Sequence, residues 1–246
     1  MKYFVILLLS VLNVYALVSI SPVEIGDNPG FSGVLKGAFD TKRGNTDSDN
    51  YTGGVKLSYD NNQSYLMWGE FNFTYGEASG VKNANNTFTH LRYIHAIEHN
   101  WDWEAFVQSQ GNEFTMVDER LLAGAGLRLH LNKERYGDLY FGFGGFYEYI
   151  NYTTSVDERE NNLRSNTYIA YKKEFTKDSK FSYVAYYQPK FTDISDYIIS
   201  NAVELTILIY EKLYINFTIN YNKDAKPAIG VKRVDFSQHT GFIYKF

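Results

Sequence analysis

Hydrophobic and polar residues alternate one by one along most of the chain after residue 30. In the segment 120–131, leucines and alanines share one face, and the other face carries Arg120, Gly124, Gly126, Arg128 and His130. Successive side chains of an extended strand point to opposite sides. An unbroken apolar face opposite cations and glycines predicts a strand with lipid on one side and a polar interior on the other.

Twelve segments of this kind are separated by turn residues. They span 31–41, 52–59, 64–75, 88–97, 101–110, 120–131, 138–149, 163–173, 180–191, 197–209, 213–221 and 233–246. The lipid face of 180–191 is ambiguous, because Val184 and Tyr186 compete with the residues on the other side. Single-chain bacterial barrels have an even number of strands. The pattern therefore predicts an all-β fold, a transmembrane antiparallel up-and-down β-barrel of about 12 strands.

The lengths of the connections support this order. If the first strand runs outward, the inner connections fall at 60–63, 98–100, 132–137, 174–179 and 210–212, and all are short. The outer ones fall at 42–51, 76–87, 111–119, 150–162, 192–196 and 222–232, and all but one are longer than any inner one. Short periplasmic turns and long outer loops are typical of outer-membrane barrels. We therefore expect the cell outer membrane as the location, with both chain ends in the periplasm.

The two ends of the chain carry targeting features. Residues 1–16 combine Lys2, a short apolar run and small residues near Ala16, which predicts a cleavable signal peptide too short to span a bilayer. Residues 17–30 are expected as a periplasmic lead-in, and the barrel as 31–246. The alternate aromatics that end at Phe246 resemble the signal that the barrel-assembly machinery reads. That machinery and outer-membrane lipid are the expected partners.

Composition narrows the class further. The chain has no cysteine, so disulfides cannot stabilise it, and aromatic residues make up 17% of it. The formal net charge is −4, and no basic block suggests a nucleic-acid partner.

Charged residues on the inward face of the predicted strands are candidates for lining the lumen. They are Lys36, Asp40, Glu70, Arg92, Glu104, Arg128, His130, Glu148, Arg164, Glu204, Arg233 and Asp235. Their signs are mixed, whereas a strongly selective pore more often has rings of one sign. We favour pairing of these charges across strands, with the glycines near Arg128 leaving room beside it. About eight strands enclose a filled interior and 16–18 an open channel, so a narrow pore and a filled lumen both remain open.

A lipid-hydrolysing barrel, similar to the outer-membrane phospholipases, is the alternative from another class. It requires a serine and a histidine within hydrogen-bond reach. His95 is expected to face lipid, and Ser237 and His239 stand two residues apart on one strand, where a nucleophile and its base seldom pair. The sequence thus predicts no catalytic residues, no cofactor and no metal ligands. A ligand-binding barrel is the other alternative.

Short motifs give the chain a family resemblance. Phe31-Ser-Gly33, Arg43-Gly-Asn-Thr-Asp47 and Asp118-Glu-Arg120 leading into Gly124-Ala-Gly-Leu127 resemble the salt-induced outer membrane protein family, a YdiY-like domain family of unknown function. The resemblance spans essentially the whole mature chain. It implies a porin-like outer-membrane barrel linked to osmotic or ionic conditions, and it carries no catalytic residues across.

Overall fold

The structure is a computed structural model that describes residues 23–42, 48–98, 100–132, 137–153, 159–176 and 178–246. The expected signal peptide, the loop motif 43–47 and His99 lie outside the described residues. No helix in the described part has the length and apolar character needed to cross a bilayer.

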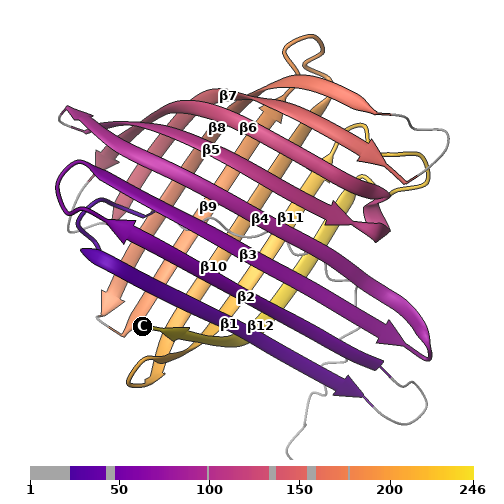
Figure 1. Ribbon diagram of the computed structural model, residues 1–246, viewed down its shortest axis with the longest axis horizontal. Helices are drawn as coiled ribbons and strands as arrows, with labels where there is room; N and C mark the ends of the chain where they lie inside the picture. The colour runs from indigo at the N-terminus through magenta and orange to yellow at the C-terminus, as the bar shows by residue number, and fades with distance from the viewer. Residues whose placement is uncertain (1–22, 43–47, 99, 133–136, 154–158, 177) are drawn as a thin grey trace, which may run out of the picture.

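Twelve strands and one turn of 3-10 helix make up the described fold (Figure 1). In chain order the elements are β1 (Gly30–Lys42), β2 (Ser48–Asp60), β3 (Tyr65–Ala78), β4 (Val81–Glu98), β5 (Trp101–Asn112), η1 (Glu113–Thr115), β6 (Val117–Asn132), β7 (Asp138–Tyr152), β8 (Glu160–Thr176), β9 (Ser179–Pro189), β10 (Tyr197–Tyr210), β11 (Leu213–Asp224) and β12 (Val234–Lys245). The predicted number of strands is confirmed.

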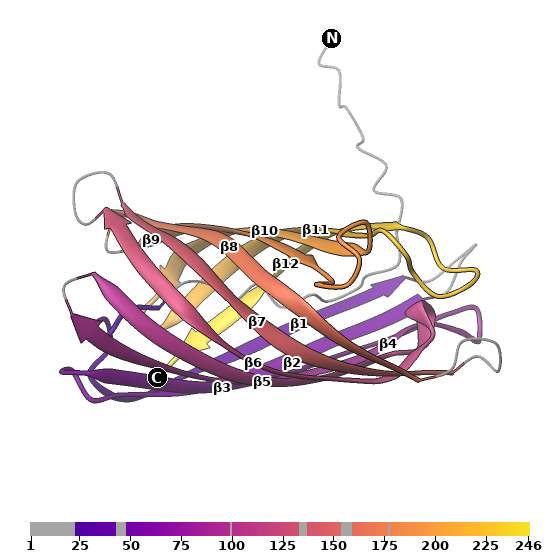
Figure 2. The same cartoon turned by 90° about the horizontal axis from the view of Figure 1, so that it is seen from above.

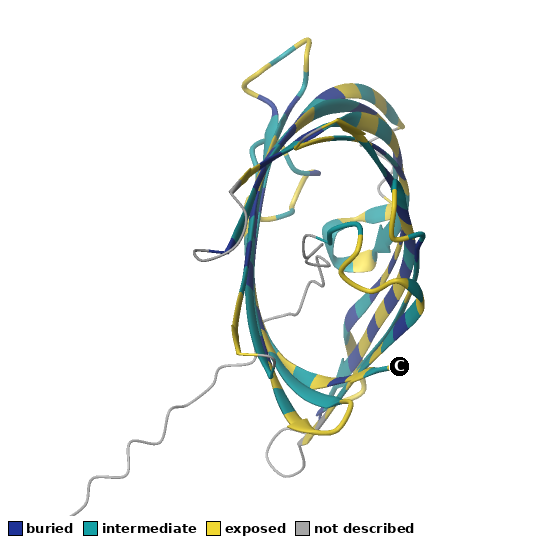
Figure 3. Cartoon of the chain, turned by 90° about the vertical axis from the view of Figure 1, so that its left-hand side faces the viewer, coloured by how far each residue is buried: buried dark blue, intermediate teal, exposed yellow. Residues whose placement is uncertain are grey.

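Each strand pairs antiparallel with the next, and β1 pairs with β12 to close the barrel (Figure 2). The closing seam runs from Val34↔Lys245 to Gly37↔Phe242, and two backbone hydrogen bonds of 3.0 Å between Gly33 and Phe246 extend it. Seen along its axis, the barrel is an elongated ring of tilted strands (Figure 3). This seam joins the first and last strands, and an open sheet edge would cost several kcal/mol per unsatisfied group in lipid.

Burial alternates along the strands as the two faces require. In β3, Met67 and Phe71 are exposed on the outside while Trp68 and Glu70 are buried inside. The strand β9, ambiguous in sequence, has Val184 inside, where it packs in a cluster with Tyr140 and Tyr168. The outer face is thus an apolar surface for lipid, and the inner face is polar with aromatic insertions.

The predicted loop 76–87 is wrong. The strand β3 continues to Ala78 and β4 begins at Val81, so Ser79 and Gly80 alone form the turn, with φ of 51° and 77°. Positive φ at both central residues is the geometry of a tight type I′ hairpin turn. The sequence pattern did not predict this extension, because the residues of the extension are polar on both faces, as expected for strands that project beyond the lipid.

The remaining connections distinguish two ends of the barrel. The long-loop end carries the connections 190–196 and 225–233, and the short-turn end carries two-residue turns such as 211–212. Residues 23–29, which we call the strap, lie inside the mouth at the short-turn end. There Val23 and Ile25 pack against Leu66, Trp68 and Ile94 of the inner wall. The expected periplasmic lead-in therefore includes a segment that contacts the lumen.

Glycines on the inward face make room for aromatic rings more than for cations. A Cβ on Gly142 would lie 2.0 Å from the ring of Tyr168, and one on Gly124 would lie 2.6 Å from Phe146 Cβ and 2.7 Å from the ring of Phe106. Without a side chain at these positions, the rings fold flat against the wall. The interior of the barrel is therefore packed most tightly along β5 to β9.

Candidate functional site

The long-loop half of the lumen is lined by a ladder of alternating charges. Glu148, fully buried on β7, accepts hydrogen bonds from Arg120 on β6 and from Arg164 on β8, with the Arg164 Nε–Glu148 Oε2 distance at 2.6 Å. Arg164 Nη2 also lies 3.0 Å from Asp196 Oδ1, and Lys190 Nζ lies 2.7 Å from Asp196 Oδ2. These groups neutralise one another along the wall, because each charge has a partner of opposite sign on a neighbouring strand or on the adjacent loop.

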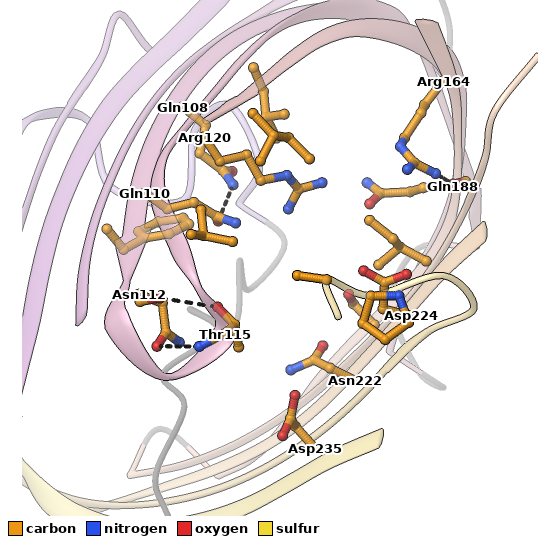
Figure 4. Close-up of a pocket in the computed structure, with 18 of the residues that line it drawn as sticks. Gln108, Gln110, Asn112, Thr115, Arg120, Arg164, Gln188, Asn222, Asp224 and Asp235 are labelled. Carbon is orange, nitrogen blue, oxygen red and sulfur yellow. Dashed lines mark hydrogen bonds between the residues drawn. The ribbon is translucent and has the colours of Figure 1, made fainter. Parts of the chain in front are cut away.

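A cavity of about 210 Å³ occupies this half of the lumen (Figure 4). One side of it is a chain of amides, in which Gln108 Oε1 lies 3.0 Å from His90 Nδ1 and Gln108 Nε2 donates to Gln110 Oε1 at 2.9 Å. Across the cavity from Arg120 stand Asn222, Asp224 and Asp235 of β11 and β12. The lining is therefore polar, with both signs of charge facing the cavity.

A buried cluster of charged and aromatic side chains lies on the inner wall between the two ends of the lumen. Glu104 Oε2 lies 3.4 Å from Arg92 Nη1 and accepts a hydrogen bond of 3.0 Å from the hydroxyl of Tyr168. The Arg92 guanidinium also lies over the ring of Phe106, 5.5 Å from its centroid. The tyrosine hydroxyl and the aromatic face hold this buried pair of opposite charges in place.

The opposite wall carries a smaller cavity of about 110 Å³ between β1, β10, β11 and β12. Lys36 Nζ lies 3.1 Å from Glu70 Oε1 here, and Glu204 stands across the same space. The ammonium of Lys56 lies over the ring of Trp68, 4.1 Å from its centroid.

At the short-turn end, charged groups of the wall form hydrogen bonds and ion pairs with the strap. Arg128 Nη2 lies 2.7 Å from Asp102 on the wall, while its Nη1 donates to the carbonyl of Val23 at 2.9 Å. Lys172 Nζ donates to Asp27 Oδ2 at 2.7 Å, and Asp60 accepts from the backbone N–H of Gly26 at 2.7 Å. The strap is therefore fastened to several strands at once.

Loop residues outside the barrel wall form two further ion pairs. Lys226 Nζ lies 2.6 Å from Asp193 Oδ2, and the hydrogen bonds from Lys226 and Ser195 hold the pKa of Asp193 well below its ordinary value. In η1, the hydrogen bonds from Lys82 and Asn85 lower the pKa of Glu113.

Ten of the twelve charged residues expected in the lumen have side chains placed on the inner wall. They are Lys36, Glu70, Arg92, Glu104, Arg128, His130, Glu148, Arg164, Glu204 and Asp235. The side chain of Asp40 lies outside the described part of the chain. Arg233 is exposed in the bend before β12, because β12 begins one residue later than expected.

Sequence reasoning missed the inward aromatics and the strap. The same even spacing that places Arg92 inside also places Tyr140, Tyr168 and Tyr186 inside, so the parity of their positions was a usable signal. Nothing in the alternation marks Glu24 or Asp27 as partners of the wall, because the strap is not a strand.

Comparisons with known proteins agree with this architecture. A family model described as a protein of unknown function, DUF481, matches residues 37–246. No curated protein matches the chain. The COG4313 outer membrane channel from Pseudomonas putida F1 shares the fold with a TM-score of 0.56 and 10% identity, over 93% of this chain and 100% of that one.

The NanC porin is similar in fold with a TM-score of 0.52 and 12% identity, over 87% of this chain and 98% of that one. Identities this low show the fold alone, which is that of outer-membrane porins and channels. The family match agrees with the resemblance to the salt-induced, YdiY-like proteins. The chain belongs to the DUF481 family of proteins of unknown function.

Proposed function

We propose that this protein is an outer-membrane channel of narrow bore for ions and small polar solutes, without catalytic activity. The observation that carries the proposal is the polar cavity of about 210 Å³ in the long-loop half of the lumen. Long outer loops and short periplasmic turns are typical of outer-membrane barrels, which supports this half at the cell surface and both chain ends in the periplasm. The strap then lies at the periplasmic mouth, and we propose that it obstructs the passage there.

The proposed passage discriminates little between cations and anions. The wall cations Arg120, Arg164 and Lys190 are matched by Glu148, Asp196 and Glu160 through direct ion pairs. A selective pore requires an excess of one sign along the path of the ion. We therefore expect a reversal potential near zero in a salt gradient. The link to osmotic or ionic conditions rests on the family resemblance.

Assembly in the outer membrane is part of the proposal. Phe242, Tyr244 and Phe246 are exposed on the outer face of the last strand and its end. Their position suits recognition by the barrel-assembly machinery before β12 pairs with β1. The outward apolar face supplies the contact with outer-membrane lipid.

A structural barrel without conductance is the second candidate, and the packed wall favours it. Tyr140, Tyr168 and Val184 fill one side of the lumen with side chains that are less than 5% exposed. A lipid-hydrolysing enzyme has less support, because Ser237 and His239 stand two residues apart on β12, where a nucleophile and its base seldom pair.

Planar-bilayer recording of the refolded mature chain tests the proposal. Discrete conductance steps with a reversal potential near zero in a potassium chloride gradient are the expected result. Glu148→Gln, which leaves the wall cations in excess, should shift the reversal potential toward anion selectivity. Absence of steps at high protein concentration, both with and without the strap, would leave the structural barrel as the better account.

A further inference from the structure

We infer that Glu24, His130 and Asp138 form a binding site for a divalent transition-metal ion of the zinc class at the short-turn mouth. Glu24 belongs to the strap, His130 lies on β6, and Asp138 is the first residue of β7. One ligand atom from each of the three side chains lies within 4.8 Å of the other two. The site therefore joins the strap to the barrel wall, and it does not depend on whether the barrel conducts.

The distances fit metal ligands better than hydrogen-bond partners. Glu24 Oε1 lies 3.3 Å from His130 Nδ1, and Asp138 Oδ1 lies 3.5 Å from His130 Nε2. Zinc takes nitrogen and oxygen ligands at about 2.0–2.2 Å in a tetrahedron, so neighbouring ligand atoms stand about 3.3–3.6 Å apart. Either ring nitrogen can thus bind an ion together with its nearby carboxylate.

One ring nitrogen of the buried His130 imidazole lacks a hydrogen-bond partner in the described part of the chain. His130 is 4% exposed, and its Nε2 has no hydrogen-bond partner among the described residues. A buried polar nitrogen without a partner destabilises the folded state, and an ion or a water bound at that atom removes this cost. The ring is held in place by stacking on Tyr140, with the centroids 4.3 Å apart. A fixed ring is a suitable first ligand, because little side-chain entropy remains to be lost on binding.

Among the charged groups near this mouth, we expect Glu24, His130 and Asp138 to bind a cation. Two other carboxylates of the mouth already have cations, since Arg128 lies 2.7 Å from Asp102 and Lys172 lies 2.7 Å from Asp27. Lys172 also approaches Asp138, but at 3.5 Å and on the second oxygen, Oδ2. Oδ1 of Asp138 is the oxygen that faces His130. The hydroxyl of Tyr140 donates to Glu24 Oε2 at 3.3 Å, which orients that carboxylate with Oε1 toward the ring.

The consequence is a metal-dependent fastening of the strap. With an ion bound, Glu24 is tied to two wall residues by coordinate bonds in addition to the existing hydrogen bonds. Because a metal bound only in the docked state stabilises that state by mass action, zinc should hold the mouth closed.

Zinc titration of the refolded mature barrel, followed by calorimetry and by metal content after dialysis, tests the inference. One zinc ion per chain is expected, with magnesium binding far more weakly. Loss of a residue that only orients a metal ligand weakens metal binding by about 10–100-fold. His130→Ala and Glu24→Gln each remove a ligand, so each should weaken zinc binding by more than this. His239→Ala is the matched control, because His239 is an interior histidine on β12 outside the trio, and it should bind zinc as the unmodified chain does.

Glu24→Gln keeps the test valid if His130→Ala fails to fold, since Glu24 lies outside the strands. Hydrogen exchange of residues 23–29 gives a second readout, in which zinc should slow exchange in the unmodified chain and leave it unchanged in Glu24→Gln. No saturable zinc uptake, or equal uptake by Glu24→Gln and the unmodified chain, would overturn the proposed site.

Discussion

The two ends of the lumen neutralise their charges in different ways. In the long-loop half, Glu148 and its arginines pair between adjacent strands, so the wall is complete without help from elsewhere. At the short-turn end, Lys172 and Arg128 reach the strap, a segment that precedes β1 and belongs to no strand. One end is therefore a fixed wall around a cavity, and the other is a mouth filled by a removable segment.

This difference separates what is rigid from what can move. Charges paired within a closed sheet cannot part without breaking the barrel. A strap held by hydrogen bonds, ion pairs and two apolar side chains can leave while the sheet stays closed, at a cost of a few kcal/mol. The comparison predicts that equivalent substitutions have large effects on stability in the wall and small ones at the strap.

Breaking the ladder should have the largest effect. Glu148→Ala leaves Arg120 and Arg164 without the carboxylate they share, and removing one partner of a buried ion pair costs roughly 3–5 kcal/mol. Urea unfolding of the barrel in lipid should show this loss. Glu160→Ala, at the half-exposed end of the same ladder, serves as the control and should cost less than about 1 kcal/mol. Equal losses for the two variants would mean that the ladder does not stabilise the wall.

Filling the space beside the Tyr168 ring should come next. Gly142→Ala places a methyl group against the ring of Tyr168, and overpacking of this kind costs about 1–3 kcal/mol. Gly37→Ala is the matched control in β1, where an added Cβ meets nothing within 4 Å. The same unfolding assay should separate the two variants, and a neutral Gly142→Ala would show that the Tyr168 ring has room to move.

Removing one charge of the strap should have a smaller effect. Asp27→Asn takes away the nearer partner of Lys172, but Asp138 remains 3.5 Å from the same ammonium. Because Asp27 is partly exposed, the loss in unfolding free energy should be below about 1 kcal/mol. A loss as large as that of Glu148→Ala would contradict the distinction between the wall and the strap.

The pH dependence of the loop pair at the long-loop end should be the smallest effect. The pKa of Asp193 is lowered in the folded state, so its pairing stabilises the loops above the ordinary aspartate pKa of about 3.9 and is lost as the pH falls toward the lower folded value. Hydrogen exchange of residues 190–196 should therefore speed up below about pH 4 in the unmodified chain relative to Lys226→Met. If both chains respond alike at each pH, the pair does not hold the loops together.

The order of the strands and the inward-facing residues of the wall could be predicted from the sequence, because both follow from the alternation of side chains along each strand. A period of two assigns Glu148 and Arg164 to one face, and antiparallel neighbours bring them together. Tyr168 follows the same alternation but was not predicted to line the lumen. The extension of β3 and β4 was not predicted, because its residues lack an apolar face. The nearer partner of Lys172, Asp27, lies 145 residues away in sequence on a segment with no periodicity, so no local pattern could indicate it.

Single-channel conductance of the barrel with and without residues 17–29 tests the central claim most directly. The strap closes the short-turn mouth in this account, so its deletion should raise the conductance several-fold while the heat-modifiable gel mobility of the folded barrel stays the same. Equal conductance of the two folded proteins would contradict the claim that the strap, and not the wall, obstructs the passage.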